Sequence, residues 1–207
     1  MLDKELEQIK TLTDTPFAFA AFEITDRNSE LSLWSAPPVF GNKPFGSGAG
    51  ETLAFLEEAL IPKLTEQYSP NKDIPIILGG YSLAGLFALW AAYTSDRFTA
   101  VAAVSPSIWF PGWNDFVNKH SPVVTSIYLS LGKKEEKTRN KTLSAVGDNI
   151  RRLYEKLKTS DLCTTLEWNE GNHFTEPKVR TAKGFAWCIY AEHNMNNIIQ
   201  EEHHEHT

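Results

Sequence analysis

Cysteine is scarce in this chain of 207 residues, which carries only Cys163 and Cys188. Two distant cysteines provide neither a disulfide framework nor the paired ligand spacing of a metal site. So few thiols are typical of a protein from a reducing compartment. We therefore expect a cytoplasmic protein with no disulfides, no metal ion and no cofactor.

Long hydrophobic runs and clusters of positive charge are also missing. No apolar stretch approaches the ~20 residues that a membrane-spanning helix needs. The first ten residues mix acids and bases with apolar residues at helical spacing, unlike a signal peptide. The formal net charge is −6, and lysine and arginine form no stripe. These absences argue against a membrane association and against a nucleic-acid partner.

The remaining composition is that of one folded domain. The chain is 42% hydrophobic, enough for a substantial core, and no linker divides it, so residues 1–200 are predicted to form a single domain. Residues 201–207 are charged and terminal, and we expect them to be a disordered tail without a function.

Apolar runs rich in β-branched and aromatic residues alternate with stretches at helical spacing, which predicts an α/β fold with a mainly parallel sheet and helices on both faces. The strand candidates are Pro16 to Ile24, Ile74 to Gly79, Thr99 to Val104, Ser126 to Leu131 and Cys163 to Trp168. The helix candidates are Gly50 to Gln67, Leu83 to Thr94, Gly112 to Lys119, Thr138 to Lys158 and Glu176 to Asn194.

A serine surrounded by small residues follows the second strand candidate. The segment from Gly80 to Ala88 predicts a strand, a tight turn and a helix, with Ser82 at the apex. Gly80 and Ala84 occupy the two positions where the strand and helix backbones come close, and Ala84 departs from the usual glycine by one methyl group. The first N–H groups of the helix, that of Leu83 above all, could stabilise a negative charge on a substrate oxygen.

The ends of the later strands supply the partners that a serine nucleophile needs. A neutral imidazole must take the serine proton, and a carboxylate must orient that imidazole. His173 follows the last strand candidate in a turn that contains glycine. Glu135 follows the strand that ends near Leu131, and Glu136, Asp148 and Glu170 are open alternatives. The order serine, acid, histidine is that of the α/β-hydrolases.

Three segments together are similar to a known family: Gly80 to Ala88, Asp96 to Phe110, and Gly171 to His173. They resemble the putative esterase family of α/β-hydrolases, whose relatives include enterochelin esterases and esterase D, over residues 74 to 187. The resemblance implies that Ser82 is the nucleophile and His173 its base, and that residues 105–109 line the site. The glutamate-rich acid region and the short N-terminal part depart from the family, and the latter implies a sheet with trimmed N-terminal strands.

The long irregular stretch from Thr25 to Ala49 follows the first strand candidate, where such folds place the second oxyanion donor. We expect a backbone N–H within residues 25–31 to serve that role. Aromatic and polar side chains near the turn that carries Ser82 are predicted to contact the substrate: Tyr81, Trp34, Ser107, Trp109 and Phe110, with Trp113 as a further wall of the pocket. The glycines from Gly46 to Gly50 lack the lysine of a phosphate-binding loop and are interpreted as a flexible, helix-capping segment.

The sequence therefore predicts a serine hydrolase that cleaves a small-molecule carboxylic ester through an acyl-enzyme on Ser82. An acyltransferase using the same acyl-enzyme is an alternative, and a non-catalytic binding module with the same fold is another. The acyl chain, the leaving group and the oligomeric state have no signature in the sequence.

Overall fold

A four-stranded parallel sheet forms the centre of the structure, a computed structural model that describes residues 2–68 and 74–205. Its strands are β1 (Ile77–Tyr81), β2 (Ala100–Val104), β3 (Ser126–Gly132) and β4 (Cys163–Asn169), and they lie side by side in chain order. All three pairings are parallel. The last four strand predictions are confirmed, and parallel order brings the carboxyl ends of all four strands to one edge.

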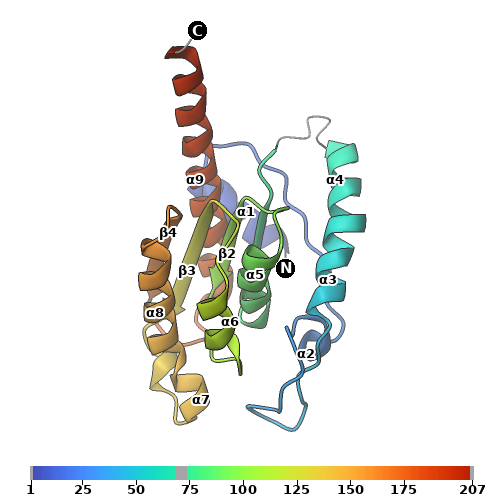
Figure 1. Cartoon of the computed structure of the whole chain (residues 1–207), viewed down its shortest axis with the longest axis vertical. Helices are drawn as coiled ribbons and strands as arrows, with labels where there is room; N and C mark the ends of the chain where they lie inside the picture. The colour runs from blue at the N-terminus through green and yellow to red at the C-terminus, as the bar shows by residue number, and fades with distance from the viewer. Residues whose placement is uncertain (1, 69–73, 206–207) are drawn as a thin grey trace.

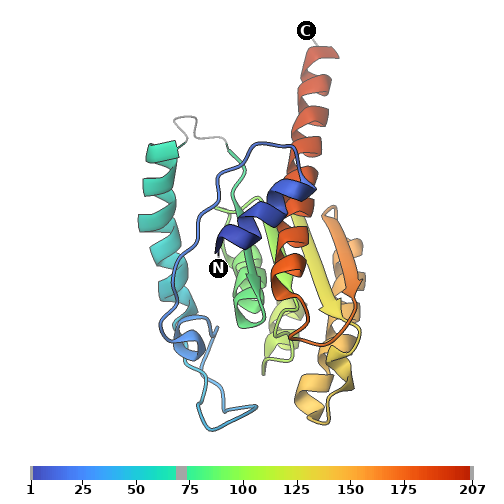
Figure 2. The same ribbon diagram turned by 180° about the vertical axis from the view of Figure 1, so that it is seen from behind.

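Helices cover both faces of this sheet (Figures 1 and 2). On one face lie α5 (Leu83–Thr94), α6 (Trp113–Lys119) and α8 (Val146–Lys158), and on the other lie α1 (Leu2–Leu12) and α9 (Pro177–Glu205). Every residue of β2 and β3 is buried, as parallel strands covered on both faces should be. The predicted fold class is confirmed.

The other elements are α2 (Arg27–Glu30), α3 (Ala49–Phe55), the π-helical turn η1 (Leu56–Leu60), α4 (Ile61–Tyr68), the 3₁₀ turn η2 (Glu135–Lys137) and α7 (Lys141–Ser144). Residues 49–68 form one helical rod beside the sheet, the cyan segment in Figure 1. It corresponds to the helix predicted from Gly50 to Gln67.

The strand predicted from Pro16 to Ile24 is wrong. Residues 16–24 carry exposed and half-buried side chains in alternation except at Ala20 and Ala21, which are both exposed, and they form no ladder. Among the described residues, β2 is the strand that pairs with β1. Phe17 and Phe19 pack near Ile9 and α9, whereas Phe22 and Ile24 pack against the main core. An apolar, aromatic-rich run indicates which side chains will pack against the protein, but it does not indicate whether a strand partner lies within hydrogen-bonding distance.

The C-terminal prediction also needs correction. Helix α9 continues to Glu205, so residues 201–205, predicted to be disordered, are helical, and residues 206–207 lie outside the described part. After Gly184 the helix contains neither glycine nor proline, and glutamate and glutamine favour helix, so no stop signal ends it at residue 200.

Candidate active site

Ser82 sits in the sharp turn between β1 and α5 with a backbone conformation of φ 63° and ψ −119°. A non-glycine residue at positive φ is strained and has to be held by its surroundings. The Ser82 N–H donates to the Val104 carbonyl at 3.0 Å, and the Ser107 N–H donates to the Ser82 carbonyl at 3.0 Å. These bonds fix the serine backbone against the neighbouring strand and its following loop.

The close approach of strand and helix explains the glycines around Ser82. A Cβ on Gly80 would lie 2.6 Å from the Ala84 carbonyl group, and a Cβ on Gly85 would lie 2.9 Å from the Gly80 oxygen. Both distances are below what real Cβ atoms show. Since Gly80 and Gly85 give the necessary room, the turn tolerates the methyl group of Ala84.

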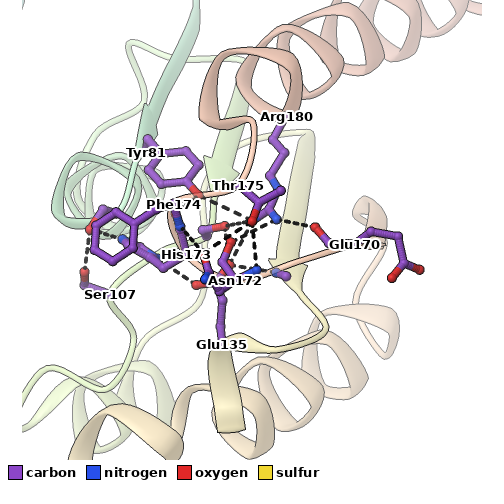
Figure 3. Close-up of polar contacts among 12 residues, drawn as sticks. Tyr81, Ser107, Glu135, Glu170, Asn172, His173, Phe174, Thr175 and Arg180 are labelled. Atoms are coloured by element: carbon purple, nitrogen blue, oxygen red, sulfur yellow. Dashed lines mark hydrogen bonds and ion pairs between the residues drawn. The ribbon is translucent and has the colours of Figure 1, made fainter. Parts of the chain in front are cut away.

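Ser82 follows β1, Glu135 follows β3 and His173 follows β4, and these three loops bring the side chains together. His173 Nε2 is 3.0 Å from Ser82 Oγ, and His173 Nδ1 is 2.7 Å from Glu135 Oε2. Figure 3 shows the His173 side chain beside Glu135. The Lys133 and Lys134 N–H groups donate to the Asn169 and Gly171 carbonyls, which joins the turn of the acid to the turn of the histidine.

Glu135 is buried and heavily hydrogen-bonded, with 5% of its side chain exposed. Its Oε1 accepts bonds from the Gly132 N–H at 2.7 Å, the Ser105 hydroxyl at 2.8 Å and Arg180 Nη1 at 3.0 Å. Burial alone would raise the pKa of Glu135, but the bonds from His173, Gly132 and Ser105 outweigh it and hold that pKa below its ordinary value of 4.5. Glu135 is therefore an anion at neutral pH.

The alternative acids lie elsewhere. Glu136 accepts a bond from Arg151 Nη2 at 2.8 Å, and Asp148 pairs with the same arginine at 3.1 Å. Glu170 pairs with Lys133 at the surface. Among these acids, Glu135 is the one that contacts the imidazole.

Arg27, which sequence reasoning missed, contacts the serine directly. Its Nη2 donates to Ser82 Oγ at 2.9 Å. The arginine opens α2, whose Asp26 side chain caps the Ser29 N–H at 3.3 Å. No carboxylate of the described residues lies within ion-pair distance of Arg27. The serine hydroxyl can thus donate to His173 while it accepts from an unpaired guanidinium.

The glycine-rich stretch before α3 holds α2 in place. The Gly46 and Gly48 N–H groups donate to the Asn28 and Ser29 carbonyls, both at 2.9 Å. A Cβ at either glycine would come within 2.9 Å of Ser29 backbone atoms. These glycines therefore serve close packing against α2 rather than flexibility, and they position Arg27.

Two of the polar residues predicted to contact substrate lie beside the serine and histidine. Ser107 Oγ is 3.4 Å from Ser82 Oγ and is almost fully buried. The Tyr81 hydroxyl donates to the His173 carbonyl at 2.5 Å. Burial raises the pKa of the Tyr81 phenol, so the hydroxyl stays protonated and remains a donor. Leu83 is the first residue of α5, where a backbone N–H has no partner within the helix.

The predicted aromatic residues form a connected cluster next to these groups. Phe110 and Trp113 lie inside it and are at most 2% exposed. Trp34 is half-buried, and its indole N–H donates to the Pro111 carbonyl at 2.8 Å. Trp109 keeps partial exposure and stacks edge-on with Phe40 at 5.9 Å. A surface pocket of about 390 Å³ adjoins Trp109 and Phe110 and is also lined by Asn114, Asn149 and Arg152.

Neither a cluster of metal ligands nor a membrane-spanning helix is found in the described parts of the chain. Within residues 2–68 and 74–205, no group of three or more His, Cys, Asp or Glu side chains could hold a metal ion. None of the helices described there is long and apolar enough to cross a bilayer.

Comparison with known proteins gives two findings. The family described as Putative esterase matches residues 14–173. Among solved structures, siderophore hydrolase EstA from Aspergillus nidulans is similar with a TM-score of 0.61 at 24% identity, covering 80% of this chain and 66% of its own. Siderophore hydrolase EstB from the same organism gives 0.61 at 23%, covering 77% and 63%. No curated protein sequence matches significantly.

An IroE-like serine hydrolase from Shewanella oneidensis is similar with a TM-score of 0.64 at 21% identity, covering 79% of this chain and 56% of its own. The present chain thus spans 56–66% of the length of these three proteins. At such identities the likeness concerns the fold.

Proposed function

Because the chain belongs to the putative esterase family, we propose that it hydrolyses carboxylic esters of small molecules through an acyl-enzyme on Ser82. The observation that carries this proposal is the hydrogen-bonded series from Ser82 Oγ to His173 Nε2 at 3.0 Å and from His173 Nδ1 to Glu135 Oε2 at 2.7 Å. Both distances fit proton transfer and imidazole orientation.

In the first half-reaction, Ser82 Oγ attacks the ester carbonyl carbon as His173 Nε2 takes the serine proton. Glu135 holds the imidazole with Nδ1–H toward itself and stabilises the imidazolium that forms. The C–O bond of the tetrahedral intermediate then breaks, and His173 gives its proton to the leaving alcohol. In the second half-reaction, His173 takes a proton from water as the water attacks the acyl carbon. The bond from that carbon to Ser82 Oγ then breaks, and His173 gives its proton to Ser82 Oγ, which releases the acid and restores the serine.

The developing oxyanion is proposed to bind between the Leu83 N–H and the Arg27 guanidinium. The carbonyl oxygen would come next to Ser82 Oγ during attack, where Arg27 Nη2 already donates at 2.9 Å. An adjacent cation and a helix N-terminus both favour negative charge at this point. Arg27 thereby replaces the backbone donor predicted within residues 25–31 as our candidate for the second donor.

Hydrolysis of a chromogenic short-chain ester tests the proposal. Wild-type protein should turn the ester over, and Ser82→Ala should lose turnover while its melting temperature stays within a few degrees. Adding an alcohol acceptor and looking for a new ester measures any acyl transfer. Equal turnover by Ser82→Ala, or no turnover across a broad ester panel, would contradict the proposed function.

A further inference from the structure

Arg180 of α9 is a buried cation next to the proposed active site, with 2% of its side chain exposed. Its Nη1 donates to Glu135 Oε1 at 3.0 Å and to Ser105 Oγ at 3.3 Å. Its Nη2 donates to the carbonyl oxygens of Glu170 at 2.6 Å and Asn172 at 3.1 Å. Figure 3 shows Arg180 with Glu135, Glu170 and Asn172 around it.

The partners of Arg180 are the parts that determine where the imidazole lies. Glu135 orients His173 directly, and the Asn172 carbonyl immediately precedes His173 in the chain. The Tyr81 hydroxyl, itself 3.4 Å from Arg180 Nη1, holds the His173 carbonyl at 2.5 Å. The Arg180 guanidinium therefore bonds Glu135, the turn that carries His173 and the end of β1 at the same time.

We propose that Arg180 is a positioning residue for the reaction proposed above, holding Glu135 and the His173 turn so that the His173–Glu135 and His173–Ser82 bonds form together. This inference rests on the proposed function for its kinetic consequences. A planar fork with donors on both terminal nitrogens can bond a carboxylate and two carbonyls at once, whereas a lysine ammonium is a point donor that cannot span them.

The neighbouring Lys183 supplies a matched control. It also lies on α9, and its Nζ pairs with Glu167 at 2.5 Å, outside the contacts of His173. Arg180→Met and Lys183→Met each remove one paired cation from the same helix. If only the loss of one positive charge from α9 matters, the two variants should lower activity equally.

The experiment measures kcat and KM for the chromogenic ester together with the downfield proton NMR signal of the His173–Glu135 hydrogen bond. We expect Arg180→Met to lower kcat on the order of 100-fold with KM changed little, because a misplacement of about 1 Å costs that much. The downfield signal should be lost or broadened. Arg180→Lys should not rescue either readout, and Lys183→Met should retain both.

A kcat near the wild-type value in Arg180→Met with the NMR signal intact would overturn the proposal, as would full rescue by lysine. If Arg180→Met does not fold, Arg180→Lys and Tyr81→Phe decide by the same two readouts, and both must lower kcat and perturb the signal. The NMR signal needs no turnover. An inactive wild type would therefore refute the proposed function, while the signal would still report whether Arg180 positions the histidine.

Discussion

Arg27 offers the sharpest test of how the proposed oxyanion would be stabilised. The change is Arg27→Met, which keeps an unbranched side chain of similar reach but removes the guanidinium that donates to Ser82 Oγ at 2.9 Å. A donor of this kind strengthens its interaction as charge develops on the carbonyl oxygen, so it acts on the transition state more than on bound substrate. The loss should therefore appear in kcat.

The magnitude follows from related sites. Removal of one oxyanion donor costs ~2.7–4 kcal/mol of transition-state stabilisation, or on the order of 10²–10³ in kcat. The Leu83 N–H would remain and keep a residual rate. Burial lowers the pKa of the Arg27 guanidinium, yet an arginine stays protonated throughout the assay range, so its contribution should not titrate near neutrality.

Steady-state hydrolysis of the chromogenic ester is the assay, with Lys43→Met as the control. Lys43 is the neighbouring cation, but it bonds Asp26 at 2.8 Å and does not contact Ser82. The control should keep kcat within about threefold of wild type, a difference below 1 kcal/mol. The reasoning fails if Arg27→Met also stays within that range, or if its whole defect lies in KM.

Two predictions concern stability. Gly80→Ala should lower the free energy of unfolding in urea by about 1–3 kcal/mol and lower esterase activity, because its Cβ would lie 2.6 Å from the Ala84 carbonyl group. Gly50→Ala is the control: its Cβ would meet nothing within 4 Å, so it should raise the free energy of unfolding by up to ~1 kcal/mol. An unchanged free energy of unfolding in Gly80→Ala would contradict the close approach of strand and helix at Ser82. Glu135→Gln should cost about 3–5 kcal/mol near pH 7 by leaving Arg180 without its carboxylate. Because the folded pKa of Glu135 is lowered, the stability it contributes is present above pH 4.5 and disappears as the pH falls through the folded value. The difference between wild type and Glu135→Gln should therefore shrink below pH 4.5, and a gap that widens toward acid would contradict this assignment.

The sequence predicts the central strands and the turn at Ser82 best, because both follow from local properties of the chain. Buried parallel strands read as continuous apolar runs, so β2 and β3 were found within a residue of their ends. The tight turn at Ser82 is recognisable from the sequence because the close approach of its strand and helix requires small residues on both sides of the serine. The strand prediction for residues 16–24 is wrong because an apolar run rich in aromatic residues is shared by strands and by extended chain that packs on a protein surface without a strand partner.

The arginines show why the rest of the site could not be predicted. Arg27 lies 55 positions from Ser82 in a four-residue helix, and only a backbone donor was expected from that loop. Arg180 lies on a long helix among other charged residues, and its burial depends on where α9 crosses the sheet. Charged residues are exposed by default, so nothing local marks the ones that a tertiary fold buries.

The most direct test of the central claim is labelling with a fluorophosphonate, followed by peptide mass spectrometry of wild type and His173→Ala. A serine activated by His173 should be phosphonylated at Ser82 in the wild type, and labelling should be slower by orders of magnitude in the variant. Labelling at another residue, or equal rates with and without the imidazole, would contradict the account.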